Sequence, residues 1–139
     1  MVLAADRDTV KREGKKASYP VSAAVRHFAG GLAVIDPATG GCRPGRTAVG
    51  DIAVGRANAP ADNTGGLLGA INVEVEHGVF RFNNSGGGDA ITRANIGAQC
   101  WIVDDEQVAL TNGGNTRSRA GIIMDVDALG VWVRIDPGL

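Results

Sequence analysis

Polar and apolar residues alternate most regularly over residues 71–76, which read Ile-Asn-Val-Glu-Val-Glu. Strict alternation places the apolar side chains on one face of a strand and the polar side chains on the other. We therefore predict a strand with one buried and one solvated face. A second apolar stretch, residues 79–82, follows directly after His77 and Gly78. This spacing predicts a tight hairpin at 76–78 between the two strands.

Short apolar runs closed by turn residues continue along the chain from Tyr19 onward, with the spacing typical of sandwiches and barrels. Together with the two strands above they predict about nine short strands. The connections between them are rich in Gly, Pro, Asn and Asp, which favour turns. The further predicted strands are residues 19–25, 32–35, 52–56, 100–103, 108–110, 120–126 and 131–135.

Only residues 92–97 have a helical pattern, with Thr92 as N-cap and Gly97 as a left-handed stop, and they span barely one turn. Without long crossover helices the strands are expected to be antiparallel. The predicted fold class is therefore all-β, an antiparallel jelly-roll-type sandwich or small barrel. The predicted core contains Ile52, Val54, Ile71, Val73, Val75, Ile102, Ile122 and Val133, with Phe80 and Phe82 on a shared face.

Residues 1–18 differ from the rest because charged side chains crowd together and few apolar residues follow Val10. No core-facing stripe can be drawn through them, so they are either a mobile tail or an arm that orders on a partner. We expect an extended N-terminal arm at residues 1–18 and a single β domain at residues 19–139. The basic residues of the arm that would meet a partner are Arg7, Lys11, Arg12, Lys15 and Lys16.

Composition supports a folded, β-rich chain of one domain. Val and Ile number 24 against nine Leu and Met, and β-branched side chains favour strands. The formal net charge of −1 gives no general attraction to nucleic acid or to anionic lipid, so neither is expected as a partner. The N-terminal residues do not have the apolar core of a signal peptide, and no apolar run approaches a membrane span. Synthesis in the cytoplasm is expected.

No catalytic constellation emerges from the candidate residues. Residues 125–136 place Asp125, Asp127, Gly130 and Asp136 at the spacing of a calcium loop, but the strand pattern of 131–135 cannot also wrap an ion. A hairpin turn at 127–130 is the better interpretation. The acidic run 104–106 is interpreted as a solvated turn between two strands, although a metal site there stays open.

The remaining reactive side chains also favour ordinary structural roles. His27 and His77 lie at a strand end and a turn, outside any metal motif, and are expected on the surface or in turns. Cys42 and Cys100 lack Cys-x-x-Cys spacing and are expected to be free thiols. We therefore expect no enzyme activity and no cofactor.

Trp132 stands between Val131 and Val133 in a predicted strand, so its side chain faces away from theirs. A tryptophan at such a position is either part of the core or an anchor for a partner. Trp132 therefore joins the arm residues as a candidate partner-binding residue.

Besides its charged start, the chain carries a series of short landmarks over nearly its full length. These stretches are residues 4–9, 12–14, 19–21, 29–32, 55–57, 78–85, 96–97, 104–105 and 125–133. Taken together they resemble the cement, or decoration, proteins of tailed-phage capsids. No single motif among them is diagnostic, and the family has no catalytic residues to carry over.

The resemblance implies a jelly-roll-type fold, a homodimer at two-fold positions, and attachment to the major capsid protein on the outside of an HK97-like phage head. It thus implies residence on the outer surface of the virion after synthesis in a bacterial host. Two alternatives stay open. One is another phage structural component, such as a head–tail connector or a tail protein. The other is a small ligand-binding β-barrel or enzyme, which would need a polar pocket that gathers several of the scattered charged residues.

Overall fold

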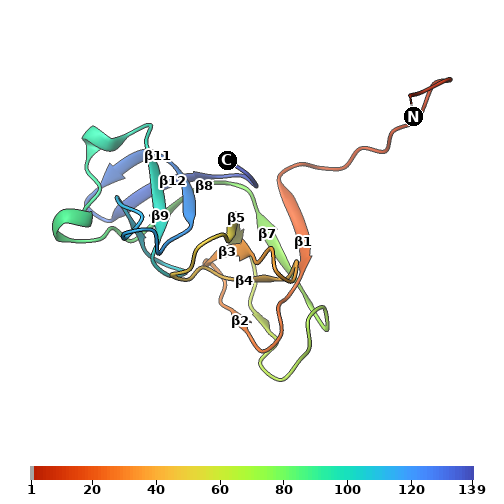
Figure 1. The fold of residues 1–139 in the computed structure, drawn as a ribbon, viewed down its shortest axis with the longest axis horizontal. Helices are drawn as coiled ribbons and strands as arrows, with labels where there is room; N and C mark the ends of the chain where they lie inside the picture. The colour runs from red at the N-terminus through yellow and green to blue at the C-terminus, as the bar shows by residue number, and fades with distance from the viewer. Residues whose placement is uncertain (1) are drawn as a thin grey trace.

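Two five-stranded antiparallel sheets form the body of the protein in a computed structural model that describes residues 2–139 (Figure 1). The strand order is β1-β7-β5-β3-β4 in the first sheet and β10-β9-β11-β12-β8 in the second. A two-stranded ribbon, β2-β6, accompanies them. The predicted all-β, antiparallel sandwich is confirmed.

The strands are short, as the spacing of turn residues predicts. The first sheet and the ribbon are built from β1 (Lys16–Pro20), β2 (Arg26–His27), β3 (Leu32–Ile35), β4 (Cys42–Pro44), β5 (Ile52–Ala57), β6 (Ala61–Asp62) and β7 (Asn72–Glu76). The second sheet is built from β8 (Gly78–Phe82), β9 (Gln99–Ile102), β10 (Val108–Ala109), β11 (Arg119–Asp127) and β12 (Gly130–Ile135). The pattern of apolar runs did not reveal β2, β4 and β6, which have two or three residues each.

The first sheet is buried on both faces at β3, and this explains the unbroken apolar run of that strand. Leu32 and Val34 point into the core between the two sheets, where they meet residues of the second sheet such as Ile102 and Val133. Ala33, between them in sequence, lies in a second core on the opposite face of the first sheet. A strand with two buried faces needs apolar side chains at consecutive positions.

Most of the predicted core residues are buried, and the register predicted for residues 72–76 is confirmed. Phe80 is only partly buried but packs against the same cluster as Phe82, so the two share a face as predicted. Ile52, the first residue of β5, and Ile71, which precedes β7, are exposed, and for these two the prediction is wrong. The confirmed core residues are Val54, Val73, Val75, Ile102, Val133 and Phe82.

Irregular pairing of β11 corrects one further core assignment. Its register shifts twice, between Arg119 and Gly121 and between Ile123 and Asp125. A β-bulge adds a residue and reverses the side on which the following side chains point. As a result Ile123 is buried and Ile122 is only half-buried, so the prediction of Ile122 as a core residue is wrong.

The turn predicted at 127–130 is present and joins β11 to β12. Asp127 lies opposite Gly130, and the Asp127 Oδ1 accepts hydrogen bonds from the backbone N–H groups of Leu129 and Gly130. The carboxylate thus stabilises a two-residue hairpin loop. The hairpin interpretation of the apparent calcium loop is confirmed.

The hairpin predicted at 76–78 is wrong, because the chain passes there from one sheet to the other. β7 pairs with β1 and β5 in the first sheet, whereas β8 pairs with β12 in the second. His77 fixes this corner, since its backbone N–H donates to the Lys15 carbonyl at 2.8 Å and its Nδ1 donates to the Val54 carbonyl at 2.5 Å. Gly78 has a φ of +154°, which favours glycine.

Helical structure is confined to two 3₁₀ turns, Gly87–Asp89 and Arg93–Asn95, within the residues that the structure describes. The second confirms the short helical segment predicted at 92–97. The Thr92 backbone N–H donates to Asn95 Oδ1 at 2.8 Å, and Gly97 has a φ of +94°. No helix in the described part of the chain is long and apolar enough to cross a membrane.

The first strand begins at Lys16, two residues earlier than the expected end of the arm at residue 18. Lys16 lies opposite Glu76 and Ser18 opposite Glu74, so residues 16–18 belong to the first sheet. Residues 2–15 carry no strand and are all exposed, and they project away from the sandwich (Figure 1).

Candidate partner-binding surface

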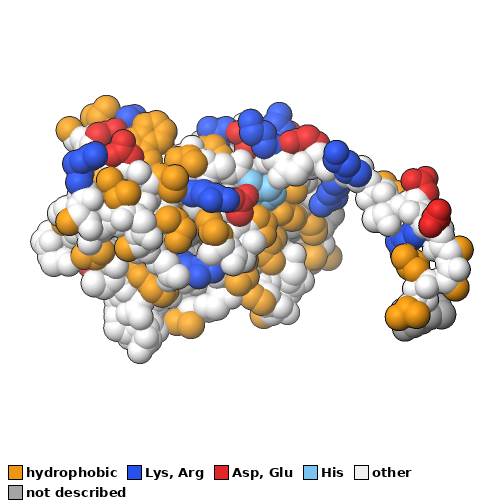
Figure 2. Space-filling view, turned by 90° about the horizontal axis from the view of Figure 1, so that it is seen from above, with side chains coloured by type: hydrophobic (Ala, Val, Ile, Leu, Met, Phe, Trp, Pro, Cys, Tyr) orange, Lys and Arg blue, Asp and Glu red, His pale blue; other side chains and the backbone are white. Residues whose placement is uncertain are grey.

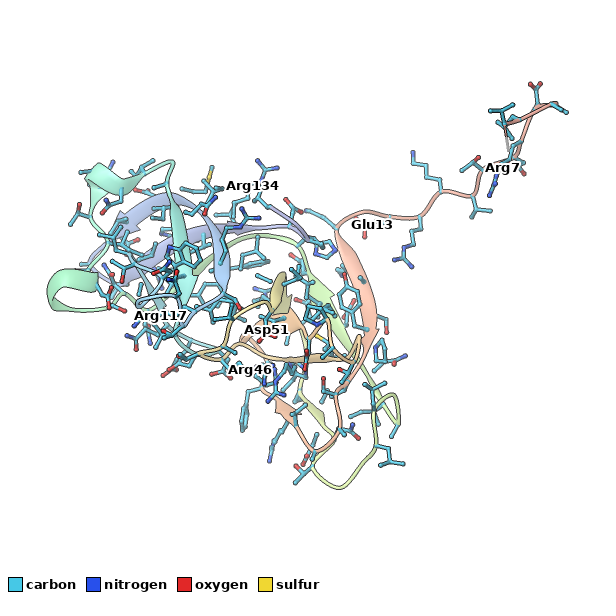
Figure 3. All side chains as sticks on the ribbon, viewed as in Figure 1. Arg7, Glu13, Arg46, Asp51, Arg117 and Arg134 are labelled. Carbon is cyan, nitrogen blue, oxygen red and sulfur yellow. The ribbon has the colours of Figure 1, made fainter. Side chains whose placement is uncertain are left out.

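Four of the basic residues predicted to meet a partner lie on the exposed segment 2–15. Arg7, Lys11, Arg12 and Lys15 are all exposed, and Arg7 lies well away from the sheets (Figure 3). Figure 2 shows charged side chains of both signs along this projecting segment. The fifth, Lys16, lies in β1 with its Nζ 3.9 Å from the Glu74 carboxylate, an exposed pair that contributes only about 0–1 kcal/mol.

A local turn fixes the base of the segment. The Glu13 carboxylate accepts hydrogen bonds from the backbone N–H groups of Lys15, at 2.7 Å, and Lys16, at 3.1 Å. The Lys15 carbonyl in turn accepts the backbone N–H of His77. The segment therefore leaves the body next to the corner where β8 begins.

Trp132 lies on the outer face of the second sheet. Its neighbours Val131 and Val133 are fully buried, so the prediction that Trp132 faces away from them is confirmed. The indole Nε1 donates to Asp127 Oδ2 at 2.9 Å, and the Arg81 guanidinium lies 5.4 Å from the centre of the indole ring. Trp132 is held in one orientation by these contacts and stays half-buried.

Asp127 connects the hairpin loop to this aromatic contact. Its pKa is lowered chiefly by the hydrogen bond from Trp132, then by the N–H of Leu129 and by the positive charge of Arg81. Hydrogen bonds to the ionised form of a carboxyl stabilise that form. The carboxylate therefore stays charged while it positions both side chains.

A shallow hollow of about 310 Å³ lies next to Trp132 and Arg81, along β8. Arg56 of β5 forms its other side, with its guanidinium 4.6 Å from the centre of the Phe80 ring. Arginine held over an aromatic ring offers an exposed cation above an apolar floor. Two such pairs, Arg56 with Phe80 and Arg81 with Trp132, thus border one hollow.

A neighbouring hollow of about 420 Å³ is bordered by acidic side chains, whereas the first is bordered by arginines. It shares Gly30 with the first and is bordered by Asp105 and Glu106. Phe28 on its rim is exposed, with the Arg26 guanidinium 4.7 Å from the centre of its ring. The acidic run 104–106 follows β9 and precedes β10, so its interpretation as a turn between two strands is confirmed.

The structure does not bring the basic residues of segment 2–15 together with Trp132. It places Trp132 instead beside Arg56, Arg81 and Phe80, none of which the sequence had marked as partner-binding. The alternation along β8 did indicate that Arg81 points away from Phe80. The proximity of Arg56 could not be predicted, because it depends on how the two sheets pack.

The histidines and cysteines have structural positions. His27 is buried, not on the surface as expected, and its Nε2 donates to the carbonyl of Cys42 in β4 at 3.1 Å. Cys42 and Cys100 are free, as predicted, and burial raises the pKa of each thiol to about 12. Among residues 2–139, no group of three or more His, Cys, Asp or Glu side chains is arranged to hold a metal ion.

Comparison with known proteins found no match to this chain among protein-family descriptions, curated proteins or solved structures.

Proposed function

We propose that this chain is a structural cement, or decoration, protein that binds the outer surface of an HK97-like phage head and stabilises contacts between major capsid subunits. The observation that carries the proposal is the contrast between a sandwich with two packed cores and a charged segment, residues 2–15, that is exposed throughout. A capsid cement needs both a rigid body and a means of reaching a neighbouring subunit. The resemblance of the sequence to cement proteins supports the same role.

Attachment through the segment has a simple physical basis. Arg7, Lys11, Arg12 and Lys15 would meet acidic groups on the shell, and ordering the segment would add contact area beyond the footprint of the sandwich. Exposed ion pairs contribute about 0–1 kcal/mol each and weaken as salt rises. A homodimer at two-fold positions would make the second attachment intramolecular and raise the overall affinity.

Co-sedimentation with purified capsids tests the proposal. The full chain is expected to pellet with the shell, and a variant with glutamine at Arg7, Lys11, Arg12 and Lys15 is expected to bind about tenfold more weakly or worse. The loss should shrink as salt is added. A matched control replaces Asp6 and Asp8 by asparagine, which leaves the basic residues in place.

Both immature and expanded capsids belong in the experiment, together with isolated portal complexes. Binding to the portal alone would identify a connector and contradict the cement role. Failure to bind either shell would also refute it. Unchanged binding of the glutamine variant would retain the cement role but show that residues 2–15 do not carry the attachment.

A further inference from the structure

The outer edge of β8 is the best exposed strand edge of the sandwich. The two five-stranded sheets end in four edge strands, β1, β4, β8 and β10, and the ribbon strands β2 and β6 have only two residues each. β1 contains Pro20, β4 has three residues and ends at Pro44, and β10 has only two residues. Proline and short length protect an edge from pairing with another strand. β8 has five residues, with neither proline nor lysine.

The backbone groups that face outward from β8 belong to Val79 and Arg81. A Cβ added to Gly130 would collide with the Phe82 carbonyl oxygen, so the Phe82 carbonyl points toward β12. Antiparallel strands alternate the direction of their backbone groups, so Val79 and Arg81 direct their N–H and C=O groups away from β12. No hydrogen bond within residues 2–139 reaches these groups. Directly after β8 this side is covered, because Asn83 is hydrogen-bonded to Glu106 and Val108. An added strand would therefore find its main-chain partners on Val79 and Arg81.

The chain's own N-terminal segment is a poor occupant of this edge, although it starts beside it. The ladder between β1 and β7 ends at the hydrogen bond from His77 to Lys15. If the N-terminal segment continued this pairing along β8 one residue at a time, Lys11 would lie directly opposite Arg81. Like charges in directly opposite positions are destabilising. The Glu13 turn also directs the segment away from the edge.

A second copy of β8 is equally unsuited. Two such edges placed side by side would bring two Arg81 residues and two Arg56 residues to one seam. Arg81 on β8 and Arg56 beside it favour instead a partner strand that carries carboxylates.

The two arginines have room for carboxylates from outside. Arg56 and Arg81 are each more than a third exposed, and their nearest carboxylates, on Glu76 and Asp127, lie 4.0 and 3.9 Å away. These distances exceed hydrogen-bonding range. Because successive side chains of a strand point to opposite faces, an added strand would direct one side chain toward Arg81 and Trp132 and the next toward Arg56.

We propose that the edge of β8 binds an extended acidic strand of another protein by β-augmentation. Main-chain hydrogen bonds to Val79 and Arg81 supply the pairing, and acidic side chains at adjacent positions contact Arg81 on one face and Arg56 on the other. The inference goes beyond the proposed function and does not depend on it, because it follows from the edge of β8 and the two arginines beside it.

A seven-residue peptide tests the proposal on the full chain. The probe is Thr-Val-Glu-Asp-Val-Val-Thr with blocked ends, and two matched peptides carry lysine at both acidic positions or N-methyl groups on alternate backbone amides. The acidic probe is expected to slow hydrogen exchange at the Val79 and Arg81 amides at least about tenfold when saturating. The lysine peptide should bind about a hundredfold more weakly, a factor of ten for each charged contact. The N-methylated peptide should not bind.

Variants locate the site. Arg81→Gln and Arg56→Gln should each weaken the acidic probe about tenfold. Arg119→Gln is the matched control, because Arg119 does not line the hollow and binds the Gly138 carbonyl instead. Folding is checked by near-ultraviolet circular dichroism for each variant.

Three results would overturn the proposal. The first is no binding of the acidic probe at about 1 mM, the upper end of weak peptide recognition. The second is equal binding of the acidic and lysine peptides. The third is slow exchange of the Val79 and Arg81 amides in the free chain, since it would mean that the N-terminal segment or a second copy already covers the edge.

Discussion

Replacing Arg46 by methionine tests how strongly one buried carboxylate depends on its partner. The Asp51 side chain is only 2% exposed, and it accepts hydrogen bonds from Arg46 Nε at 2.8 Å and Arg46 Nη2 at 3.2 Å (Figure 3). The Asp51 backbone N–H donates to the Ser118 hydroxyl, and this hydrogen bond connects the segment before β5 to the loop before β11. Removing Arg46 would leave a buried carboxylate without its cation.

The expected magnitude follows from the unequal exposure of the two side chains. Breaking a buried ion pair by deleting one partner costs about 3–5 kcal/mol. The Arg46 side chain is 36% exposed, so water can partly replace it and the lower end of that range applies. A loss of about 3 kcal/mol in a domain of this size lowers Tm by about 10 °C. Asp51→Asn should cost less, about 1 kcal/mol. The charge left unpaired is then that of Arg46, which is more exposed to water than Asp51.

Urea denaturation of the two single variants and the double variant measures these losses in the free energy of unfolding. The double variant should be less destabilised than the sum of the single variants, since the neutral pair no longer buries an unpaired charge. Equal losses for Arg46→Met and Asp51→Asn would refute the reasoning from burial. A loss below about 1 kcal/mol for Arg46→Met would refute it too, because the pair would then behave as an exposed one.

Three other properties can be measured on the same protein. Gly130→Ala should lower stability by about 2 kcal/mol in thermal unfolding, because the new Cβ would collide with the Phe82 carbonyl; Gly86→Ala is the control, because Gly86 has an extended backbone with a φ of −109° and open space around its Cβ. Cys42 and Cys100 should react with a thiol reagent only after urea unfolding, since burial raises both pKa values to about 12. Burial lowers the pKa of His27 in the folded state, so the unfolded chain takes up the proton first. Stability should therefore be complete above about pH 6.5 and fall below it, and His27→Gln should flatten this dependence in urea titrations at pH 7 and pH 5.

Local sequence patterns were sufficient to predict a strand with one solvated face, or a turn that is stabilised by one of its own side chains. The burial of Val73 and Val75 was predictable, because strict alternation alone assigns both side chains to one face of the strand. The turn at 127–130 was predictable because the side chain that stabilises it, Asp127, lies within the turn. These features need no knowledge of the rest of the fold.

Features that depend on distant segments were not predictable. The ribbon β2-β6 has two residues in each strand and exists because Arg26 and His27 lie opposite Asp62 and Ala61. The burial of His27 depends on distant segments too, because His27 pairs with Ala61 and bonds the carbonyl of Cys42 in β4. The shifts in β11 come from its pairing with β9 and β12. Gly121 at the first shift is the one local sign of an irregular strand, and it does not reveal which following side chain is buried.

The crossing at His77, in place of the predicted hairpin, leaves the outer edge of β8 uncovered. A hairpin and a strand that crosses between two sheets leave the same alternating pattern in residues 72–82, because each half keeps one buried face. In a hairpin, β7 would cover one side of β8. In the observed crossing, β12 takes one side, and the side continuous with the β1 edge of β7 stays uncovered. The positive charge of residues 11 and 12, which would also serve to bind a partner, has an effect within the chain. It opposes closure of that edge from within the chain, beside Arg81, and leaves the main-chain groups of β8 to a strand of opposite charge.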